Sequence, residues 1–345
     1  MRCNNPNYIY FSDNDSDNKK RVKFINGSNT IEYLEKLNID MSNLIEVPCG
    51  RCVACRLAYS AEWADRCDME SKLHKHTWFI TLTYRDECLV YGSKGFPTVE
   101  KDAISCFIRK LRDKLGHDTL IRYFGCAEYG EGKGDRQGFN PHYHIIVFGP
   151  NLDDLTIDMP DMSKDLLPSG KYPIFRRQNR DGDFVMFSQT IYDCWKKGKI
   201  EVEEASWNCC AYVSRYVVKK QFGRDAALYE RLGILPEYLR MSTKPGIGAN
   251  YLLLQKNKLL RFDYLSVKNK SGVKTYHPPR YFEKLMNKDC ESVDAALMES
   301  NKLSRINNAK RRFIEESSRK SVKQKNADNE EILKLKTKML TRSLT

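Results

Sequence analysis

The region between residues 120 and 148 most strongly constrains how this chain can fold. Two strand-like runs, Leu120–Tyr129 and His142–Phe148, flank a loop that contains four glycines. Strands joined by a glycine-containing loop most simply pair side by side in opposite directions. The sequence therefore predicts an antiparallel hairpin here.

Further elements are expected on both sides of this hairpin. Residues 78–84 alternate and are rich in β-branched and aromatic side chains, which predicts a strand, and Ile104–Leu115 has its apolar residues at helical spacing. Residues 198–203 are another candidate strand, and a helix is expected over 206–221 with Ser206 as its N-cap. The order strand, helix, strand, strand, helix is typical of an α+β fold of ferredoxin-like type, with an antiparallel sheet and helices on one face.

Composition changes along the chain predict four parts. Residues 1–70 form an N-terminal segment with a cysteine cluster, and residues 71–225 form the core, with an insertion at 150–190 rich in Asp, Pro and Gly. A helical or irregular extension follows at 226–300, and a basic tail at 301–345. The insertion carries a basic cluster that we expect to help read a DNA origin: Lys171, Arg176, Arg177 and Arg180.

Positive charge is concentrated in the tail. The 345 residues carry 58 Lys and Arg against 45 Asp and Glu, a net charge of +13, and residues 301–345 hold 13 basic and 5 acidic residues, a net charge of +8. We expect a solvated helix or a flexible arm that binds phosphates without reading sequence, although a tail that only adds solubility is an equal alternative.

Membrane and secretory roles are not expected. No run approaches the ~20 consecutive apolar residues of a membrane helix. The first residues, Met1 to Pro6, lack the apolar core of a signal peptide.

The strand Pro141–Phe148 carries a candidate metal site. Because strand side chains alternate, His142 and His144 project from the same face and can grip one divalent ion. Glu128, on the preceding strand, can complete a set of two histidines and one carboxylate. Such a set leaves open coordination positions and suits Mn²⁺ or Mg²⁺ acting on phosphate oxygens as well as it suits zinc. A surface His-x-His pair without metal is the alternative.

A second His-x-His pair serves as an internal comparison. His74 and His76 have the same spacing, but a lysine lies between them and no apolar strand continues from them. We expect this pair to be exposed and without a metal.

The helix expected over 206–221 carries two tyrosines. Tyr212 and Tyr216 stand four residues apart and so share one helix face, and Lys219 follows Tyr216 by three. A tyrosine, with its ordinary pKa of about 10, becomes a useful nucleophile when a cation stabilises its ionised form. Alternatively, the tyrosine rings pack on the sheet and the lysines are solvated.

The motifs together resemble the HUH endonuclease superfamily and, more narrowly, the replication initiation proteins of the Microviridae, the gokushovirus-like group in particular. The resemblance covers about residues 1 to 285, and position 140, where a basic residue is expected, holds Asn140. It rests on these segments in order: Cys49–Arg56, Phe79–Tyr84, Glu128–Gly130, Pro141–His144, Ala211–Lys220, Lys244–Gly248 and Pro278–Tyr281.

This resemblance implies site-specific nicking and joining of single-stranded DNA at a replication origin during rolling-circle replication, in the cytoplasm of a bacterial host. His142 and His144 would hold Mg²⁺ or Mn²⁺ with Glu128 as third ligand. Tyr212 and Tyr216 would alternate as nucleophiles, assisted by Lys219, through a 5′-phosphotyrosine link that leaves a 3′-hydroxyl for a polymerase. No Gly-x-x-x-x-Gly-Lys-Ser/Thr motif occurs, so unwinding is expected from a host helicase.

The cysteine cluster predicts a structural zinc site. Cys49, Cys52 and Cys55 supply three thiolates, and structural zinc takes four ligands. Cys3 is the expected fourth, because it lies in an irregular N-terminal segment and the resemblance also places a cysteine near the start, and Cys67 is the alternative. An iron–sulfur cluster is disfavoured because its fourth cysteine would fall at position 59, which is Tyr. Free thiols remain open.

Two other functions compete with this interpretation. A transposase or plasmid relaxase of the same superfamily is the nearest enzyme. A non-enzymatic, zinc-containing nucleic-acid-binding regulator suits the charge and the cysteines, but it gives no reason for Glu128, the histidine pair and the tyrosine pair to occur together.

Overall fold

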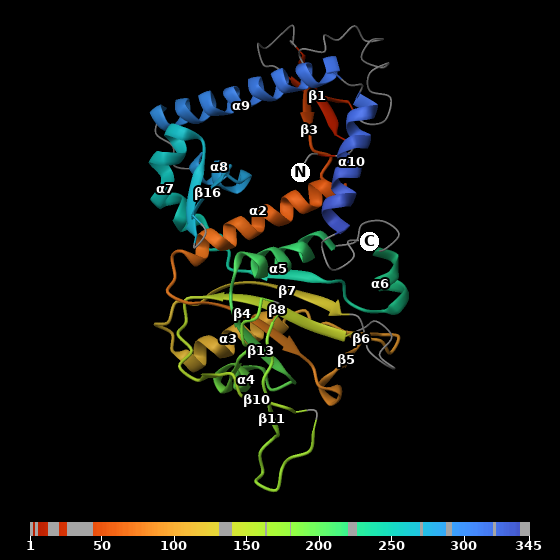
Figure 1. Cartoon of the computed structure of the whole chain (residues 1–345), viewed down its shortest axis with the longest axis vertical. Coiled ribbons are helices and arrows are strands. Elements are labelled where there is room, and N and C mark those ends of the chain that lie inside the picture. The colour runs from red at the N-terminus through yellow and green to blue at the C-terminus, as the bar shows by residue number, and fades with distance from the viewer. Residues whose placement is uncertain are drawn as a thin grey trace. The chain divides into compact units, whose positions relative to one another are not determined.

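The computed structural model describes residues 3, 6–12, 21–25, 44–130, 140–162, 164–179, 181–219, 226–269, 272–287, 292–319 and 322–338 (Figure 1). The chain divides into two compact units. The first comprises residues 1–59, 255–266 and 275–345, and the second comprises residues 60–254 and 267–274. The functional boundaries expected near residues 70, 225 and 300 stay predictions.

The second unit is built on a five-stranded antiparallel sheet. The sheet has the order β13-β4-β8-β7-β14. Its strands are β4 (Thr77–Thr83), β7 (Arg122–Gly130), β8 (Asn140–Phe148), β13 (Ile200–Glu204) and β14 (Tyr238–Met241). The expected hairpin is β7 with β8, and the two other expected strands are β4 and β13. The edge strand β14 was not expected.

One face of the sheet packs against α3 (Ala103–Leu115) and α4 (Gln189–Trp195). Ile80, Leu82, Tyr143 and Ile145 point to this side, where they meet apolar residues of both helices. The connectivity β4-α3-β7-β8-α4-β13, with both helices on one face, is that of a ferredoxin-like sandwich. The short helix α4 was missed because it lies in the segment interpreted as an insertion. Its N-cap is Ser188, whose hydroxyl accepts a hydrogen bond from the Ile191 amide.

The opposite face is also covered by helices, so the expectation of helices on one face is wrong. Ala64 and Cys67 of α2 (Val53–Ser71), with Cys210 and Val213 of α5 (Trp207–Lys219), pack against the sheet. Their partners are Phe79, Phe124, Ile146 and Phe148. The central strands are apolar on both faces, and each apolar face must be buried. The helix expected over 206–221 is α5, and Ser206 caps it by accepting the Cys209 amide hydrogen bond at 3.3 Å.

The first unit contains a three-stranded sheet and the C-terminal helices. Its strands are β1 (Asn7–Ser12), β2 (Arg21–Ile25) and β3 (Ile45–Val47), and its long helices are α9 (Ser292–Arg319) and α10 (Val322–Lys338). Phe313 packs among Tyr8, Ile25 and Leu44, and Leu333 packs against Ala54 and Leu57. The tail is therefore helical, as expected, but both helices are anchored by buried side chains instead of being wholly solvated.

The remaining elements are short. Two strand pairs lie in the expected insertion, β9 with β12 and β10 with β11. No helix among the described residues is long and apolar enough to cross a membrane. The bounds of these elements are η2 (Asp86–Cys88), β5 (Val90–Tyr91), β6 (Pro97–Thr98), β9 (Leu155–Thr156), β10 (Met159–Pro160), β11 (Ile174–Phe175), β12 (Phe187–Ser188), α6 (Ala226–Leu232), α7 (Ala249–Phe262), β15 (Leu265–Asn269), β16 (Gly272–Tyr276) and α8 (Arg280–Met286).

A buried ion network joins α2, β7 and the loop at residues 244–248. The Glu70 carboxylate accepts hydrogen bonds from Arg122 Nε at 2.5 Å, the Gly248 amide at 2.7 Å and His74 Nε2 at 3.1 Å. Arg122 also donates to the Pro245 carbonyl at 2.8 Å. The expectation that His74 is exposed is therefore wrong, since its side chain is only 7% exposed.

We predict that Glu70→Gln lowers the free energy of unfolding by about 3 kcal/mol or more, because it leaves the buried Arg122 without its charged partner. The exposed pair Arg176–Asp158 provides the control, and Asp158→Asn should cost less than about 1 kcal/mol. Equal effects in denaturant titrations would contradict the buried network.

Acid should remove the same contribution. Burial raises the pKa of Glu70, but hydrogen bonds from His74, the Gly248 amide and Arg122 outweigh it, so the pKa is lowered from its ordinary 4.5. Stability from a carboxylate with a lowered pKa is present above the ordinary value and is lost as the pH falls through the folded value. Glu70→Gln should therefore show a smaller loss of stability between neutral and acid pH than the unmodified chain.

Candidate functional site

Strand pairing brings the three predicted metal ligands together. In the β7–β8 ladder, Glu128 lies directly opposite His142, and Cys126 lies opposite His144. On the other side of β8, Thr81 pairs with His144. The three candidate ligands thus share the sheet face that α5 covers. All three are buried, with at most 8% of each residue exposed.

The ligand atoms converge on one point. His142 Nε2 lies 2.5 Å and His144 Nε2 lies 3.1 Å from the same oxygen, Glu128 Oε1. The three ligand atoms all lie within 4.8 Å of one another. Two imidazoles and one carboxylate in this arrangement can bind a metal ion.

The hydrogen bonds around the site fit a bound cation. His142 Nδ1 lies 2.8 Å from the Asn140 carbonyl oxygen, while His142 Nε2 faces the Glu128 carboxylate. A neutral imidazole has one N–H and so cannot donate to both acceptors. Glu128 Oε2 is buried without a hydrogen-bond partner among the described residues. A cation bound between these side chains accounts for both features.

Electrostatics keeps the ligands in the forms that bind metal. Burial raises the pKa of Glu128, but hydrogen bonds from His142 and His144 outweigh it and lower the pKa to about 2. Burial lowers the pKa of His144, against the opposing effect of Glu128. At neutral pH the carboxylate is therefore ionised and His144 is neutral, as metal ligands must be.

Three further residues shape the site, and sequence inspection did not identify them. Thr81 Oγ1 lies 2.9 Å from His144 Nδ1, and the Phe79 ring stacks on the His144 ring at 5.3 Å. A side chain at Gly130 would place its Cβ 2.9 Å from His142 Cε1, so only glycine leaves room for that imidazole. Strand alternation could have pointed to Thr81, because Phe79 and Thr81 share one face of a predicted strand.

Of the two predicted nucleophiles, the structure describes the side chain of Tyr212. Its hydroxyl donates to Glu128 Oε1 at 3.2 Å and lies 3.4 Å from His144 Nε2. The Arg215 guanidinium lies 5.6 Å from the centre of the Tyr212 ring. The side chains of Tyr216 and Lys219 lie outside the described residues. A phenol, a cation and the candidate metal ligands thus meet in one place.

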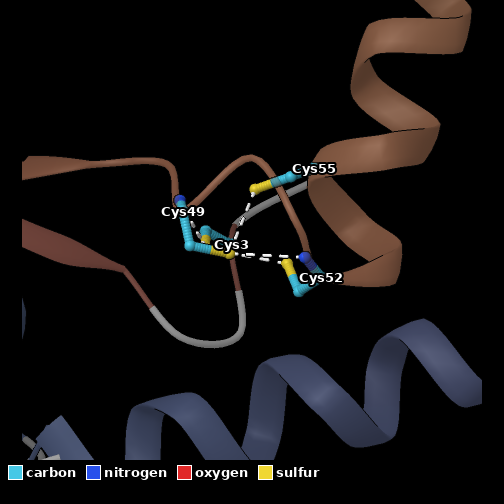
Figure 2. Close-up of side chains that lie close together, drawn as sticks. All are labelled: Cys3, Cys49, Cys52 and Cys55. Atoms are coloured by element: carbon cyan, nitrogen blue, oxygen red, sulfur yellow. Dashed lines mark hydrogen bonds between the residues drawn. The ribbon is translucent and has the colours of Figure 1, made fainter. Parts of the chain in front are cut away.

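The four predicted zinc ligands also lie together, in the first unit (Figure 2). Cys3 Sγ lies 3.7 Å from Cys52 Sγ, and Cys49 Sγ lies 4.0 Å from Cys55 Sγ. A disulfide needs about 2.05 Å, so these thiols are not paired covalently. The alternative ligand Cys67 instead lies in the sheet core of the second unit. This cluster can bind a metal.

Amide hydrogen bonds favour thiolates in the cluster. The amides of Cys49 and Cys52 donate to Cys3 Sγ and Cys49 Sγ, each at 3.3 Å. Burial raises the pKa of Cys49, but backbone hydrogen bonds from Cys52 and Arg51 outweigh it and lower the pKa to about 7. A thiolate, rather than a thiol, is the form that binds metal.

We predict that Thr81→Val weakens Mn²⁺ binding at the Glu128 site by roughly 10- to 100-fold, because it removes the partner that orients His144. Thr83→Val, two residues further along β4, is the matched control and should leave the affinity unchanged. Isothermal titration with Mn²⁺ measures both, and equal affinities for the two variants would contradict the orienting role.

Comparison with known proteins agrees with this site. Residues 77–221, which hold Glu128, His142, His144 and Tyr212, match the family described as Replication-associated protein ORF2. No solved structure matches the chain.

Three relatives are named replication-associated proteins. ORF2 of Spiroplasma virus 4 is 36% identical over 249 residues, which cover 70% of this chain and 68% of the relative. VP4 of Bdellovibrio phage phiMH2K is 30% identical over 50% of this chain and 48% of the relative. ORF4 of Chlamydia phage 1 is 28% identical over 55% of this chain and 43% of the relative. The chain therefore belongs to the ORF2 family of replication-associated proteins, with these Microviridae-like phage proteins among its members.

Proposed function

We propose that this protein is a rolling-circle replication initiator, an HUH endonuclease that nicks and rejoins single-stranded phage DNA at its origin. The observation that carries the proposal is the Tyr212 hydroxyl, which lies 3.2 Å from Glu128 Oε1 at the candidate metal ligands. A phenol there lies next to the place where a metal-bound phosphate would be attacked. The family membership supports a role in phage DNA replication.

Glu128, His142 and His144 hold the catalytic ion in this proposal. A bound Mg²⁺ or Mn²⁺ supplies the positive charge that polarises the scissile phosphate and stabilises charge in the transition state. His144 is oriented by Thr81 at 2.9 Å, and His142 by the Asn140 carbonyl at 2.8 Å. These bonds hold both imidazoles with Nε2 facing the site.

Tyr212 is the nucleophile in the first step. Its phenolic oxygen forms a bond to phosphorus while the bond to the 3′ oxygen breaks, and the departing oxygen takes up a proton to become a 3′-hydroxyl. The Arg215 cation beside the Tyr212 ring favours the ionised phenol. The product is again a phosphodiester, now between tyrosine and the 5′ end, so little bond energy is lost and a 3′-hydroxyl can reverse the reaction.

Tyr216 is the proposed second nucleophile, with Lys219 assisting. Helical spacing supports this, since positions four apart share a face of α5. A second tyrosine can cut the newly copied origin while Tyr212 still holds the old 5′ end. The free 3′-hydroxyl then attacks the first link and closes a circle.

Zinc is the proposed occupant of the cysteine cluster. A tetrahedral site with Zn–S bonds of about 2.3 Å has sulfur atoms about 3.8 Å apart. The sulfur separations of 3.7 and 4.0 Å support that geometry. Four thiolate ligands leave no open position, which is typical of a structural site.

The partners follow from the proposed chemistry. The protein acts on single-stranded DNA in the cytoplasm of the bacterial host, and a host polymerase extends the 3′-hydroxyl while a host helicase unwinds. A transposase or relaxase of the same superfamily would share the tyrosine chemistry but not the origin. A non-enzymatic zinc-containing regulator would bind DNA without forming a covalent product.

We predict that Tyr212→Phe combined with Tyr216→Phe abolishes a denaturation-resistant adduct between the protein and the 5′ end of a nicked oligonucleotide. The assay uses Mn²⁺ and single-stranded DNA that spans the phage origin, and denaturing gels detect the adduct. Tyr229→Phe, on α6, is the control and should retain the adduct. An adduct that persists in the double variant would contradict the assignment.

We further predict that the anaerobically purified protein contains about one zinc per chain. Cys3→Ser should lower both the zinc content and the melting temperature, because it removes one of four ligands. Cys88→Ser, at a cysteine outside the cluster, should change neither. Elemental analysis that finds no zinc would exclude the site.

A further inference from the structure

The edge strand β13 presents polar side chains to the same sheet face as the metal site. Thr81, in the intervening strand β4, pairs with Glu201 on one side and with His144 on the other. The Thr83 amide donates to the Lys199 carbonyl at 2.9 Å, and Thr83 pairs with His142. Lys199 and Glu201 therefore lie two strands, roughly 10 Å, from the histidines.

The Glu201 carboxylate holds two cations beside the site. Lys199 Nζ lies 2.7 Å from Oε1, and an Arg177 terminal nitrogen lies 2.7 Å from Oε2. Glu201 is only 12% exposed, whereas Lys199 is 44% and Arg177 is 46% exposed. The acid is thus covered, and its two cations keep a net charge of +1 facing solvent.

The cations are held in place before any ligand arrives. Lys199 Nζ also lies 5.4 Å from the centre of the Phe175 ring, on the short strand that precedes Arg177. A guanidinium has five N–H donors, so its bond to Glu201 leaves others for a ligand. Groups that are already ordered lose little conformational entropy on binding.

The surface between the cations and the metal site is polar and accessible. Thr81 and Thr83 are both half-buried, and their short side chains lie in the rows that join β13 to β8. A single strand of DNA with its scissile phosphate at the metal site can cross these threonines. Its next phosphates would then meet the cations of β13.

We propose that Arg177 and Lys199, positioned by Glu201, form a phosphate-binding subsite for the DNA backbone beside the scissile phosphate. The subsite rests on the proposed function, because the metal site must hold the scissile phosphate. It contacts the backbone and so does not read sequence. It also separates Arg177 from the origin-reading role that the sequence suggests for the whole basic cluster.

The neighbouring residue Arg176 provides a matched control. Its guanidinium pairs with Asp158 at 2.7 Å and does not share the Glu201 carboxylate. The sequence treats the two arginines alike, and only the fold distinguishes them. Lys171 is exposed, and Arg180 lies outside the described residues.

The test measures binding of fluorescent oligothymidylate to the full chain without divalent metal, over a series of KCl concentrations. Arg177→Ala and Lys199→Ala should each reduce the slope of log affinity against log salt by about 0.7, which is about fivefold in affinity at ~0.1 M salt. Arg176→Ala should change neither quantity. Thermal unfolding of each variant checks that the fold is retained.

Slopes for Arg177→Ala and Lys199→Ala that equal the slope for Arg176→Ala would overturn the subsite. An altered choice of nicking position in Arg177→Ala would overturn it too, because a backbone contact weakens all sequences alike. The two proposals fail separately: loss of the salt effect with adduct formation intact rejects the subsite, whereas loss of nicking with the salt effect intact rejects the proposed endonuclease.

Discussion

The register of the β7–β8 hairpin is the constraint on which the site depends. It sets Glu128 opposite His142 and thereby brings two histidines and a carboxylate to one sheet face. A slip of one residue would move every side chain of one strand to the opposite face. The apolar neighbours oppose such a slip, since Phe124 and Ile146 belong to the core beneath α2 and α5, while Tyr143 and Ala127 belong to the core beneath α3 and α4.

Burial gives the polar site its chemical character. Glu128 remains ionised in a nearly water-free position because both histidines lie against one of its oxygens. Its second oxygen has no partner among the described groups, and an unsatisfied buried carboxylate oxygen is costly. A bound cation offsets that cost. The same α5 helix that buries the face also delivers Tyr212, so covering the sheet and building the site are one structural event.

Particular residues show how far prediction from sequence reached. The strands, the helix at 103–115, and the grouping of Glu128 with His142 and His144 followed from periodicity, which is local. The second covered face was missed because α2 and α4 have no distinctive pattern, and His74 was misjudged because its burial depends on Glu70 and Phe148, which lie apart in sequence from each other. The anchoring of the tail by Phe313 and Leu333 was equally invisible, since each partner lies more than two hundred residues away.

The sequence by itself determined which chemical groups are available: two histidines on alternating strand positions, a helix with spaced tyrosines, and three close cysteines. Those follow from backbone periodicity, which neighbouring residues dictate. Only the tertiary structure decided which groups meet. It placed the Tyr212 hydroxyl on Glu128, Cys3 beside Cys52, and Arg177 rather than Arg176 on Glu201. The physical reason is that strand register and helix packing act over long sequence separations, where no local pattern records the partner.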